Sequence, residues 1–523
     1  MSLLHRLIIS MAIFHFDRFL RGSLVFALAL FLVLGFNPAG AREAHFTLLF
    51  TNDHHGQVDP VHEGNASGAV GGVTRRMALI EKIRKEMGPA NVILVDSGDI
   101  FTGTALSSFS HGEVDCEAYQ MMQYDAVAIG EHDFDYGTKA LLEERKKFKI
   151  PWISANIVVR SNSQNFVKPY VLKYAGVRVG IIGFSNPDTP NLTSRANVGG
   201  LTFNPAGAAA KGLHSILKKD ADIFIALSHL GVEADKKFAK DNPFIHVIIG
   251  GHSYTALTEP IVEKRADGSL AGPLIVQAGS RGLYLGRLDL TIKGRRDPKT
   301  KKEEYWVDDY KYKLIPITAD LPEDPQMAAL VDKYKDKLKE KPLDEVLATV
   351  SGDLTQADQG DSLIGEITAD AMREEFRAQV ALINNDSFHP EFKSGNLTRE
   401  NLYEVFPRDE EVVTLDVPGV YLRKILEASA PKKGQGGFLQ VSGLKIEKDG
   451  EELKIQVGNE PLNDKGKYLV ATNGYMAESG SVLLRRVKSR RKTQVKIREL
   501  LEKALKAKAK VSPTDMDKRW SIP

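Results

Sequence analysis

The sequence is poor in cysteine, with Cys116 as the single one among 523 residues. One cysteine cannot form an intramolecular disulfide, and it excludes a Cys-rich zinc or iron–sulfur site. Any metal ion must therefore be held by His, Asp, Glu or Asn side chains. The sequence also lacks an excess of either charge. It contains 70 Lys and Arg and 68 Asp and Glu, which gives a formal net charge of +2. This balance argues against a dedicated nucleic-acid-binding protein, and we expect no nucleic-acid polymer as a partner.

The composition excludes extended disorder, and the length excludes a single small module. Hydrophobic residues make up 42% of the chain and charged residues 26%, which is typical of globular proteins. At roughly 100–200 residues per domain, a chain of this length is expected to fold as two or three domains.

An apolar segment near the N-terminus is short for a membrane span. Three arginines precede the run Leu24–Phe36, and the small residues Ala39-Gly40-Ala41 follow it. The alternative is a transmembrane anchor, but a span needs roughly 20 apolar residues, whereas small residues after the run are typical of a cleavage site. We therefore expect a signal peptide cleaved after Ala41, no stable membrane anchor, and a mature protein that is periplasmic or secreted.

Short apolar runs alternate with amphipathic stretches between about residues 45 and 315. The runs predicted to be buried strands are 46–50, 92–95, 126–129, 179–182, 223–227 and 247–249. The stretches predicted to be helices include 75–87, 139–147 and 205–218. This alternation predicts an α/β architecture, in which ligand sites lie outside the carboxyl ends of the strands.

The rest of the chain has a different pattern. A lysine-rich helix is predicted at 326–341, and a second domain opens with a helix at 362–376. Residues 485–510 carry 12 Lys and Arg against two Glu, which we interpret as a solvated terminal helix rather than an arm that binds lipid or nucleic acid. The predicted divisions are a signal peptide 1–41, a first domain 42–315, a linker 316–343, a second domain 344–510 and a tail 511–523.

Clusters of candidate metal ligands follow five of the predicted strands. They are Thr51–Gly56, Asp96–Asp99, Gly130–Asp135, Ser228-His229 and Gly250–Ser253. Asp53 and His55 are two residues apart, so on an extended segment they would face the same side. A lone histidine after a strand is more often structural, but five such clusters are hard to explain by packing, because ionisable groups gathered there would repel one another without a cation. Mixed nitrogen and oxygen ligands suit Zn, Mn or Fe better than Ca.

These clusters resemble the motifs of the two-domain 5′-nucleotidase family, a branch of the calcineurin-like dimetal phosphoesterases. The matching segments of the first domain are TNDHHG, DSGDIFTG, GEHDFDYG, SHLG, GGHS and VQAGSRGLYLGRLDL. Those of the second domain are GDSLIGEITADAMR, GNLTRENLYEVFP and GGFLQVSGLKIE. The resemblance implies an α/β fold, α+β overall. A four-layer metallophosphoesterase β-sandwich flanked by helices would be followed by a helical linker and a second, mixed α/β substrate domain.

The resemblance also implies a site with two divalent metal ions, Mn, Zn or similar. The implied metal ligands are Asp53, His55, Asp99, His229 and His252. Asp99 would bridge both ions, and His132, oriented by Asp135, would lie near the scissile phosphate as a catalytic dyad. Two cations roughly 3.5–4 Å apart neutralise phosphoryl oxygens and activate a water as nucleophile, while a histidine can protonate the leaving oxygen.

Two positions depart from the family pattern at this site. Glu131 stands where the family has a metal-ligand Asn. Glu can still ligate, but its added negative charge should tighten metal binding, reduce Lewis acidity and repel an anionic substrate. Tyr254 stands where the family commonly has a His or Gln ligand to the first metal. A neutral phenol is a poor ligand unless deprotonated, so we expect Tyr254 to ligate its ion weakly.

The substrate-binding motifs of the second domain have changed further. The family's substrate-binding Arg aligns with His389, and its PF-x-N element contains Arg408 here. Both could offer replacement cations. Phe438 remains where one ring of a base-stacking pair is expected, although a core position explains it equally well. The ribose-binding Asp and the second aromatic residue are replaced by Ser481 and Leu483.

The sequence therefore predicts an exported, monomeric dimetal phosphoesterase of the 5′-nucleotidase type. Its substrate would be a small-molecule phosphate ester or nucleotide. A non-catalytic metal- or ligand-binding protein on the same fold is the main alternative, and Glu131, Tyr254 and the changed substrate motifs favour it. Thiosulfate-ester hydrolysis is a further alternative, but the segment EHDFDYG retains the phosphatase form of the dyad.

Overall fold

The structure is a computed structural model that describes most of the chain after residue 41. The described residues are 42–61, 68–265, 270–296, 303–339, 342–354, 360–388, 392–408, 410–450 and 452–522. The predicted signal peptide and the candidate residue His389 lie outside the described residues. Within the described ranges, no helix combines the length and the hydropathy needed to cross a bilayer.

Contacts within the chain separate two units of very different size. Among the described residues, the smaller unit comprises residues 42–43, 292–296 and 303–306, and in it Arg42 Nη1 lies 3.0 Å from Glu303 Oε2. The larger unit comprises Ala44–Thr291 and Val307–Pro523. All the described candidate site residues belong to the larger unit.

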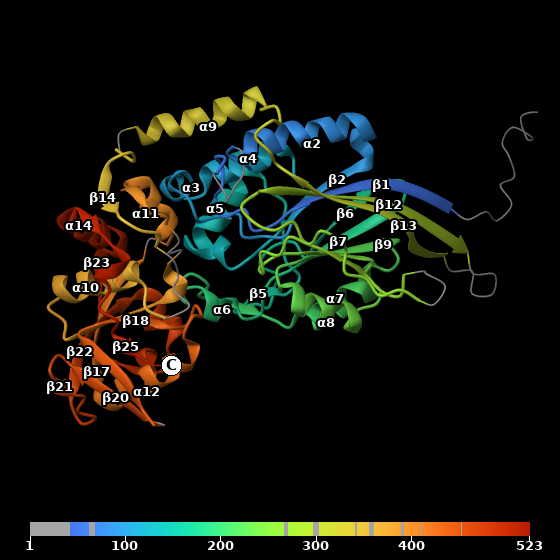
Figure 1. Cartoon of the computed structure of the whole chain (residues 1–523). Coiled ribbons are helices and arrows are strands. Elements are labelled where there is room, and N and C mark those ends of the chain that lie inside the picture. Colours follow the sequence, from blue (N-terminus) through green and yellow to red (C-terminus); the bar gives the residue numbers. More distant parts are fainter. Residues whose placement is uncertain are drawn as a thin grey trace, which may run out of the picture. The chain divides into compact units, whose positions relative to one another are not determined.

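Two sheets with mainly parallel strands form the first part of the chain (Figure 1). The six-stranded sheet has the order β13 (Glu303–Pro316), β12 (Tyr284–Arg296), β1 (Arg42–Thr51), β2 (Val92–Asp96), β3 (Ala126–Ala128), β4 (Trp152–Ile153). The five-stranded sheet has the order β11 (Leu274–Val276), β10 (Val247–Gly250), β9 (Ile223–Ser228), β7 (Arg178–Phe184), β6 (Tyr170–Tyr174). Strands β1 to β4 run parallel, as do β7, β9, β10 and β11. The predicted α/β architecture is confirmed, and each of the six predicted strands is present.

Helices cover the outer faces of both sheets and complete four layers. In Figure 1, α2 (Val73–Met87), α4 (Glu113–Met122) and α9 (Pro325–Leu338) lie on one side of the sheets, and α7 (Ala206–Leu217) and α8 (Val232–Asp241) lie on the other. Apolar residues of α2 recur at helical spacing, and Val73, Met77, Ile80 and Ile83 are buried. The helix ends at Gly88, whose φ of +81° is readily adopted by glycine.

The lysine-rich helix α9 packs on the first part of the chain. Asp324 begins it, because its side chain accepts hydrogen bonds from the backbone N–H groups of Gln326 and Met327. The buried residues of α9 are Met327, Leu330, Val331, Tyr334 and Leu338, and they share one hydrophobic core with residues of β1, β2, α2 and α4. The segment predicted as a linker helix therefore contributes one face to this core.

The second part of the chain is built around a mixed five-stranded sheet. Its order is β18 (Leu439–Ser442), β15 (Val380–Asn384), β22 (Lys467–Asn473), β17 (Glu411–Pro418), β23 (Arg490–Lys496). Strands β15 and β22 are parallel, and the other neighbours are antiparallel. The helices of this part are α10 (Leu363–Glu375), α11 (Arg399–Val405), α12 (Gly419–Ser429), α13 (Val482–Arg486) and α14 (Ile497–Lys508).

Smaller elements complete the fold. Those of the first part are α3 (Ala105–Ser110), α5 (Gly137–Phe148), β5 (Ile157–Val159), α6 (Thr189–Leu192) and β8 (Leu201–Phe203). Those of the second part are β14 (Val346–Val350), β16 (Gly395–Thr398), β19 (Leu444–Asp449), β20 (Glu452–Val457), β21 (Glu460–Pro461), β24 (Lys510–Val511) and β25 (Trp520–Ser521).

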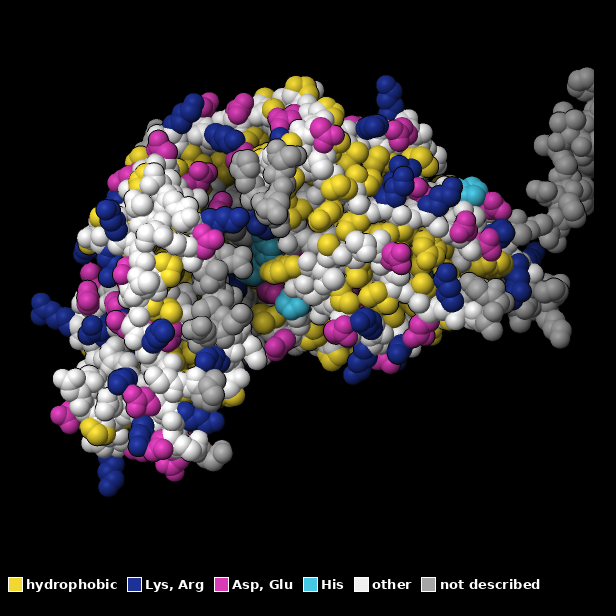
Figure 2. All heavy atoms as spheres, in the orientation of Figure 1, with side chains coloured by type: hydrophobic (Ala, Val, Ile, Leu, Met, Phe, Trp, Pro, Cys, Tyr) yellow, Lys and Arg dark blue, Asp and Glu magenta, His cyan; other side chains and the backbone are white. Residues whose placement is uncertain are grey.

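The basic stretch 485–510 differs from the prediction of a single terminal helix. It contains the end of α13, the strand β23 and the helix α14. β23 pairs with β17, and α14 buries Ile497, Leu500, Leu501 and Leu505. The basic residues lie between these buried positions, which explains why composition alone suggested a solvated helix. On the face shown in Figure 2, Lys and Arg side chains are interspersed with Asp and Glu.

Candidate metal centre

Loops that follow five parallel strands carry the predicted metal ligands. Three of these loops leave β1, β2 and β3 of the six-stranded sheet, and two leave β9 and β10 of the five-stranded sheet. The predicted ligands on them, in chain order, are Asp53, His55, Asp99, Glu131, His229 and His252. The site therefore lies where carboxyl ends of strands from both sheets meet, as expected for an α/β fold.

The backbone of these loops adopts left-handed conformations that non-glycine residues rarely take. The angle φ is +50° at Asp53, +49° at His55, +58° at Asp99 and +72° at His252. Such conformations cost of order 1–3 kcal/mol each and gather at functional sites. The prediction of an extended segment at residues 53–55 is wrong, because β1 ends at Thr51. Both side chains nevertheless reach the site, with His55 Nε2 3.9 Å from Asp53 Oδ1.

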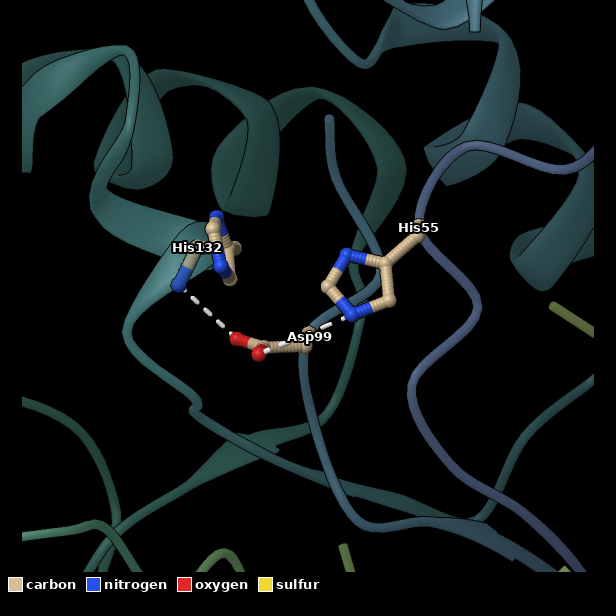
Figure 3. Close-up of side chains that lie close together, drawn as sticks. All are labelled: His55, Asp99 and His132. Atoms are coloured by element: carbon tan, nitrogen blue, oxygen red, sulfur yellow. Dashed lines mark hydrogen bonds and ion pairs between the residues drawn. The ribbon is translucent and has the colours of Figure 1, made fainter. Parts of the chain in front are cut away.

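The ligand atoms form overlapping groups around Asp99. His55, Asp99 and His132 form one group, and Figure 3 shows the two histidines on either side of the carboxylate. Asp53, Asp99 and His229 form a second group, and Glu131, His229 and His252 form a third. Within each group the potential ligand atoms lie within 4.8 Å of one another. Asp99 therefore belongs to two groups and can serve both.

Several buried atoms of these groups make no hydrogen bond of good geometry. They are Asp99 Oδ2, Glu131 Oε2 and His229 Nε2. Burying a charged oxygen or a ring nitrogen without a partner is costly. Divalent cations bound by these groups would satisfy the buried atoms, and imidazole nitrogen with carboxylate oxygen is a donor set used by Zn, Mn and Fe. The residues present thus fit the metal ions that the sequence motifs imply.

Crowded carboxylates set the electrostatics of the site. Burial raises the pKa of Asp53 to about 7, and the negative charge of Asp99 adds to this effect. Burial opposes the charged form of His229, but the carboxylates of Asp99 and Glu131 outweigh it and raise the pKa of His229 well above its usual value. His229 Nε2 lies 3.1 Å from Asp99 Oδ2 and 3.2 Å from Glu131 Oε2. This arrangement demands positive charge between the carboxylates.

A second layer of polar residues, which sequence reasoning missed, orients the ligands. Asp133 accepts hydrogen bonds from the backbone N–H groups of Asp99, Ile100 and Gly130, and so ties the loop after β2 to the loop after β3. Asn52 Nδ2 donates to Asp53 Oδ2 at 2.7 Å. These residues stand inside the recognised motifs, but their roles depend on backbone partners that spacing does not reveal.

His132 and Asp135 form the predicted pair. The Nδ1 atom of His132 lies 2.8 Å from Asp135 Oδ2, and the backbone N–H of His132 donates to Asp99 Oδ1 at 2.8 Å. Burial lowers the pKa of His132, but the carboxylates of Asp135 and Asp99 outweigh burial and raise it to about 9. The imidazole is therefore held as a proton donor beside the ligand groups.

Two family models match the chain. Residues 46–255 match the model of the calcineurin-like phosphoesterases, and residues 345–485 match that of the 5′-nucleotidase C-terminal domain. The chain is also similar to human 5′-nucleotidase, with 30% identity over 451 residues that cover 78% of this chain and 76% of that protein. The chain belongs to the 5′-nucleotidase family. It is therefore a phosphoric ester hydrolase.

Bacterial relatives of this family cover most of the chain. The protein UshA of Yersinia enterocolitica is 27% identical, and the match covers 87% of this chain and 90% of that protein. The crystal structure of the 5′-nucleotidase precursor from Thermus thermophilus superposes with a TM-score of 0.78 at 28% identity, and the match covers 91% of this chain and 99% of that one. The order of the two domains matches the family, whose first domain implies divalent metal ions.

Glu131 and Tyr254, the two departures from the family pattern, occupy different surroundings. Glu131 lies among the ligands, with Oε1 2.7 Å from His252 Nδ1. Tyr254 is 45% exposed, and its ring stands edge-on to that of His55, with centroids 5.2 Å apart. Burial of the hydroxyl and the charge of Asp53 raise the pKa of Tyr254 well above its usual value. The phenol is thus held neutral, in which form it is a poor ligand.

The substrate-binding candidates of the second domain also differ in their surroundings. Phe438 is fully buried and packs on Trp520, with ring centroids 4.9 Å apart, so it occupies a core position in this structure. The guanidinium of Arg408 lies over the ring of Tyr475, 6.0 Å from its centroid. Nη2 of Arg408 is 3.5 Å from Nε2 of His132.

Proposed function

We propose that this protein is an exported dimetal phosphoesterase that hydrolyses nucleotides or related organic phosphates, with water as the nucleophile. The observation that carries the proposal is the position of Asp99, whose buried carboxylate is shared by two groups of potential ligand atoms. One shared carboxylate between two such groups is the arrangement that a two-metal site requires.

The chain offers enough side chains for two divalent ions, Mn, Zn or similar. The residues that would hold them are Asp53, His55, Asp99, Glu131, His229 and His252. When bound, such ions neutralise phosphoryl oxygens and lower the pKa of a water so that it can attack phosphorus. The Nδ1 atom of His229 donates to the carbonyl oxygen of Ser97 at 2.7 Å, which keeps Nε2 directed at the site. We propose Tyr254 only as a weak additional ligand, because its phenol is neutral.

His132 is the proposed general acid. With its pKa raised to about 9, the ring carries a proton on each nitrogen at neutral pH. Nδ1 donates to Asp135, which fixes the orientation of the ring. Nε2 would donate its proton to the oxygen of the leaving group as the bond to phosphorus breaks. Arg408, close to Nε2, would hold the anionic substrate, and His389 is a further proposed contact.

A non-catalytic metal-binding protein is the second candidate. The observation that favours it is Glu131, whose two oxygens lie close to two different histidines. A carboxylate in that position can complete the ligand set of a single ion together with the two histidines. The number of tightly bound ions distinguishes the two candidates, because two per chain support the phosphoesterase and one per chain supports the alternative.

The remaining proposals concern processing and organisation. We propose that residues 1–41 direct export and are cleaved after Ala41, which makes the mature protein periplasmic or secreted. We propose a metallophosphoesterase domain at 42–315, a linker at 316–343, a substrate domain at 344–510 and a tail at 511–523, in a monomeric protein. Mass spectrometry of the exported protein tests the cleavage site.

The decisive experiment is phosphate release by the purified protein with Mn²⁺, in the presence and absence of a chelator. The substrates are 5′-AMP, a UDP-sugar, a 2′,3′-cyclic nucleotide and an aryl phosphate. Chelator-sensitive turnover of 5′-AMP supports a nucleotidase. Turnover of the aryl phosphate alone supports a phosphoesterase with a different natural substrate. Absence of turnover on every substrate, with metal bound, would overturn the proposed function.

A further inference from the structure

Tyr254 is an exposed aromatic residue beside the metal ligands. It follows β10 two residues after His252, and 45% of its surface is accessible. Six other large hydrophobic side chains are comparably exposed in the described part of the chain, namely Leu172, Tyr174, Ile216, Val346, Val420 and Val482. None of these six belongs to a ligand-bearing loop. An aromatic ring that is open to solvent next to a reaction centre calls for an explanation.

The backbone holds Tyr254 in place at an energetic cost. Its φ is +54°, a conformation unfavourable for a residue with a bulky side chain. The neighbours on both sides are fixed, because the hydroxyl of Ser253 donates to Gln277 Oε1 at 3.0 Å and the carbonyl oxygen of Thr255 accepts from the N–H of Gly279 at 3.1 Å. The loop therefore presents this ring at a defined position.

The ring of Tyr254 continues a row of rings that begins at the dyad. The ring of His132 lies 5.0 Å from that of His55, at an interplanar angle of 75°. The ring of His55 lies 5.2 Å from that of Tyr254, at 82°. An edge-on contact uses only part of an aromatic ring, and Tyr254 as a whole residue is 45% exposed. Of the two aromatic residues that the sequence singled out, Phe438 is buried against Trp520, so Tyr254 is the one with an open ring.

We propose that Tyr254 is a specificity-determining residue that stacks on an aromatic group in the alcohol part of the phosphate ester. The inference rests on the proposed phosphoesterase function and narrows its substrate class to esters that carry a planar aromatic ring. A neutral ring with an open face recognises another ring by stacking, whereas it offers a phosphate oxygen no positive charge. The role is thus in substrate selection, and it does not depend on the weak metal contact proposed above.

A matched pair of substrates tests this role. Benzyl phosphate and cyclohexylmethyl phosphate have the same charge and nearly the same size, and both release a primary alcohol, but only the first has an aromatic ring. We expect the wild-type protein to favour the benzyl ester, and Tyr254→Leu to lower the ratio of the two kcat/KM values by about 2- to 12-fold, the effect of one lost aromatic stacking contact. Tyr254→Phe should retain the ratio, because it keeps the ring. Tyr174→Leu, at an exposed tyrosine of β6, is the control and should leave the ratio unchanged.

Measuring the binding of compounds that cannot be hydrolysed tests this inference independently of the proposed function. Benzylphosphonate and cyclohexylmethylphosphonate cannot be hydrolysed, so calorimetry of the metal-loaded protein reads their affinities even if neither ester turns over. A preference for benzylphosphonate that Tyr254→Leu removes, with metal content unchanged, supports the proposal. Equal affinity of the wild-type protein for the two phosphonates would overturn it. Loss of bound metal in Tyr254→Leu would also overturn it, because Tyr254 would then support the metal centre.

Discussion

His132 is the residue whose removal should separate catalysis from metal binding. It contacts Asp135 and Asp99, while the carboxylates and the other histidines can hold cations without it. We expect His132→Ala to lower turnover by about 10²- to 10⁴-fold, the usual contribution of a general acid, with metal content near that of the wild-type protein. Steady-state kinetics and metal analysis of the same preparation test this.

The control for this variant is His111→Ala, at an exposed histidine at the end of α3. It should retain wild-type turnover. Unchanged turnover in His132→Ala would remove His132 from the mechanism. A parallel loss of metal would show that it acts as a ligand.

Asp115 is a buried acid whose charge should make stability depend on pH. Burial raises its pKa to about 7, above the value of about 4 in an unfolded chain. The folded state therefore keeps a proton that the unfolded state has lost, so this residue stabilises the fold at low pH, and the contribution is lost as pH rises from 4 to 7. We expect Asp115→Asn to gain stability relative to wild type at pH 8 but not at pH 4, by up to about 4 kcal/mol. Urea unfolding at pH 4 and pH 8 measures the difference in the free energy of unfolding between the variant and the wild-type protein. The same difference at both pH values would contradict the prediction.

What the sequence reveals about single residues depends on where their partners are. The clustering of the candidate ligand side chains could be predicted, because each of them follows a recognisable strand. The role of Asp133 could not, because its partners are backbone N–H groups of two separate loops. The burial of Phe438 could not be decided either, because Trp520, which covers it, belongs to a strand 82 residues further along the chain.

At the scale of elements, α9 shows how a charged composition can hide a packed helix. Leu330 is buried in the first hydrophobic core, whereas Lys333 is exposed and lies 3.2 Å from Glu117. We expect Leu330→Ala to destabilise the protein by about 2–5 kcal/mol through the cavity it leaves. Lys333→Ala, the control on the same helix, should cost about 1 kcal/mol at most. Thermal unfolding of the two variants tests this prediction. Equally small losses of stability in both variants would mean that α9 does not stabilise this core.

Elements were predicted well where periodicity is strong. The six apolar runs form strands as predicted. Their apolar residues follow one another without interruption, so both faces of each strand are apolar and can be buried in a sheet covered on both sides. The structure of the basic stretch 485–510 was not predicted correctly. Its apolar positions are separated by many Lys and Arg residues, and the pairing of β23 with β17 determines its structure.

At the scale of the whole molecule, the ligands come from both sheets of the first part. Asp53, Asp99 and Glu131 follow strands of the six-stranded sheet, and His229 and His252 follow strands of the five-stranded sheet. A cation held by these residues would therefore join loops of two separate sheets, and it would also relieve the repulsion of three buried carboxylates. Because the unfolded chain lacks this arrangement, we expect metal binding to be coupled to folding.

Removing the metal should consequently destabilise the protein as well as stop turnover. At a free ion concentration 100 times the Kd, binding stabilises by about 2.7 kcal/mol, which corresponds to a rise in Tm of about 5–10 °C for a domain of this size. We expect Mn²⁺ to restore both the Tm and the turnover of chelator-treated protein. His229→Ala, which removes a proposed ligand that follows a strand of the five-stranded sheet, should lose most of the rise in Tm, whereas His111→Ala should keep it. A Tm that does not respond to Mn²⁺ would mean that the carboxylates are neutralised by protons, with His229 retaining the positive charge that a cation would otherwise supply.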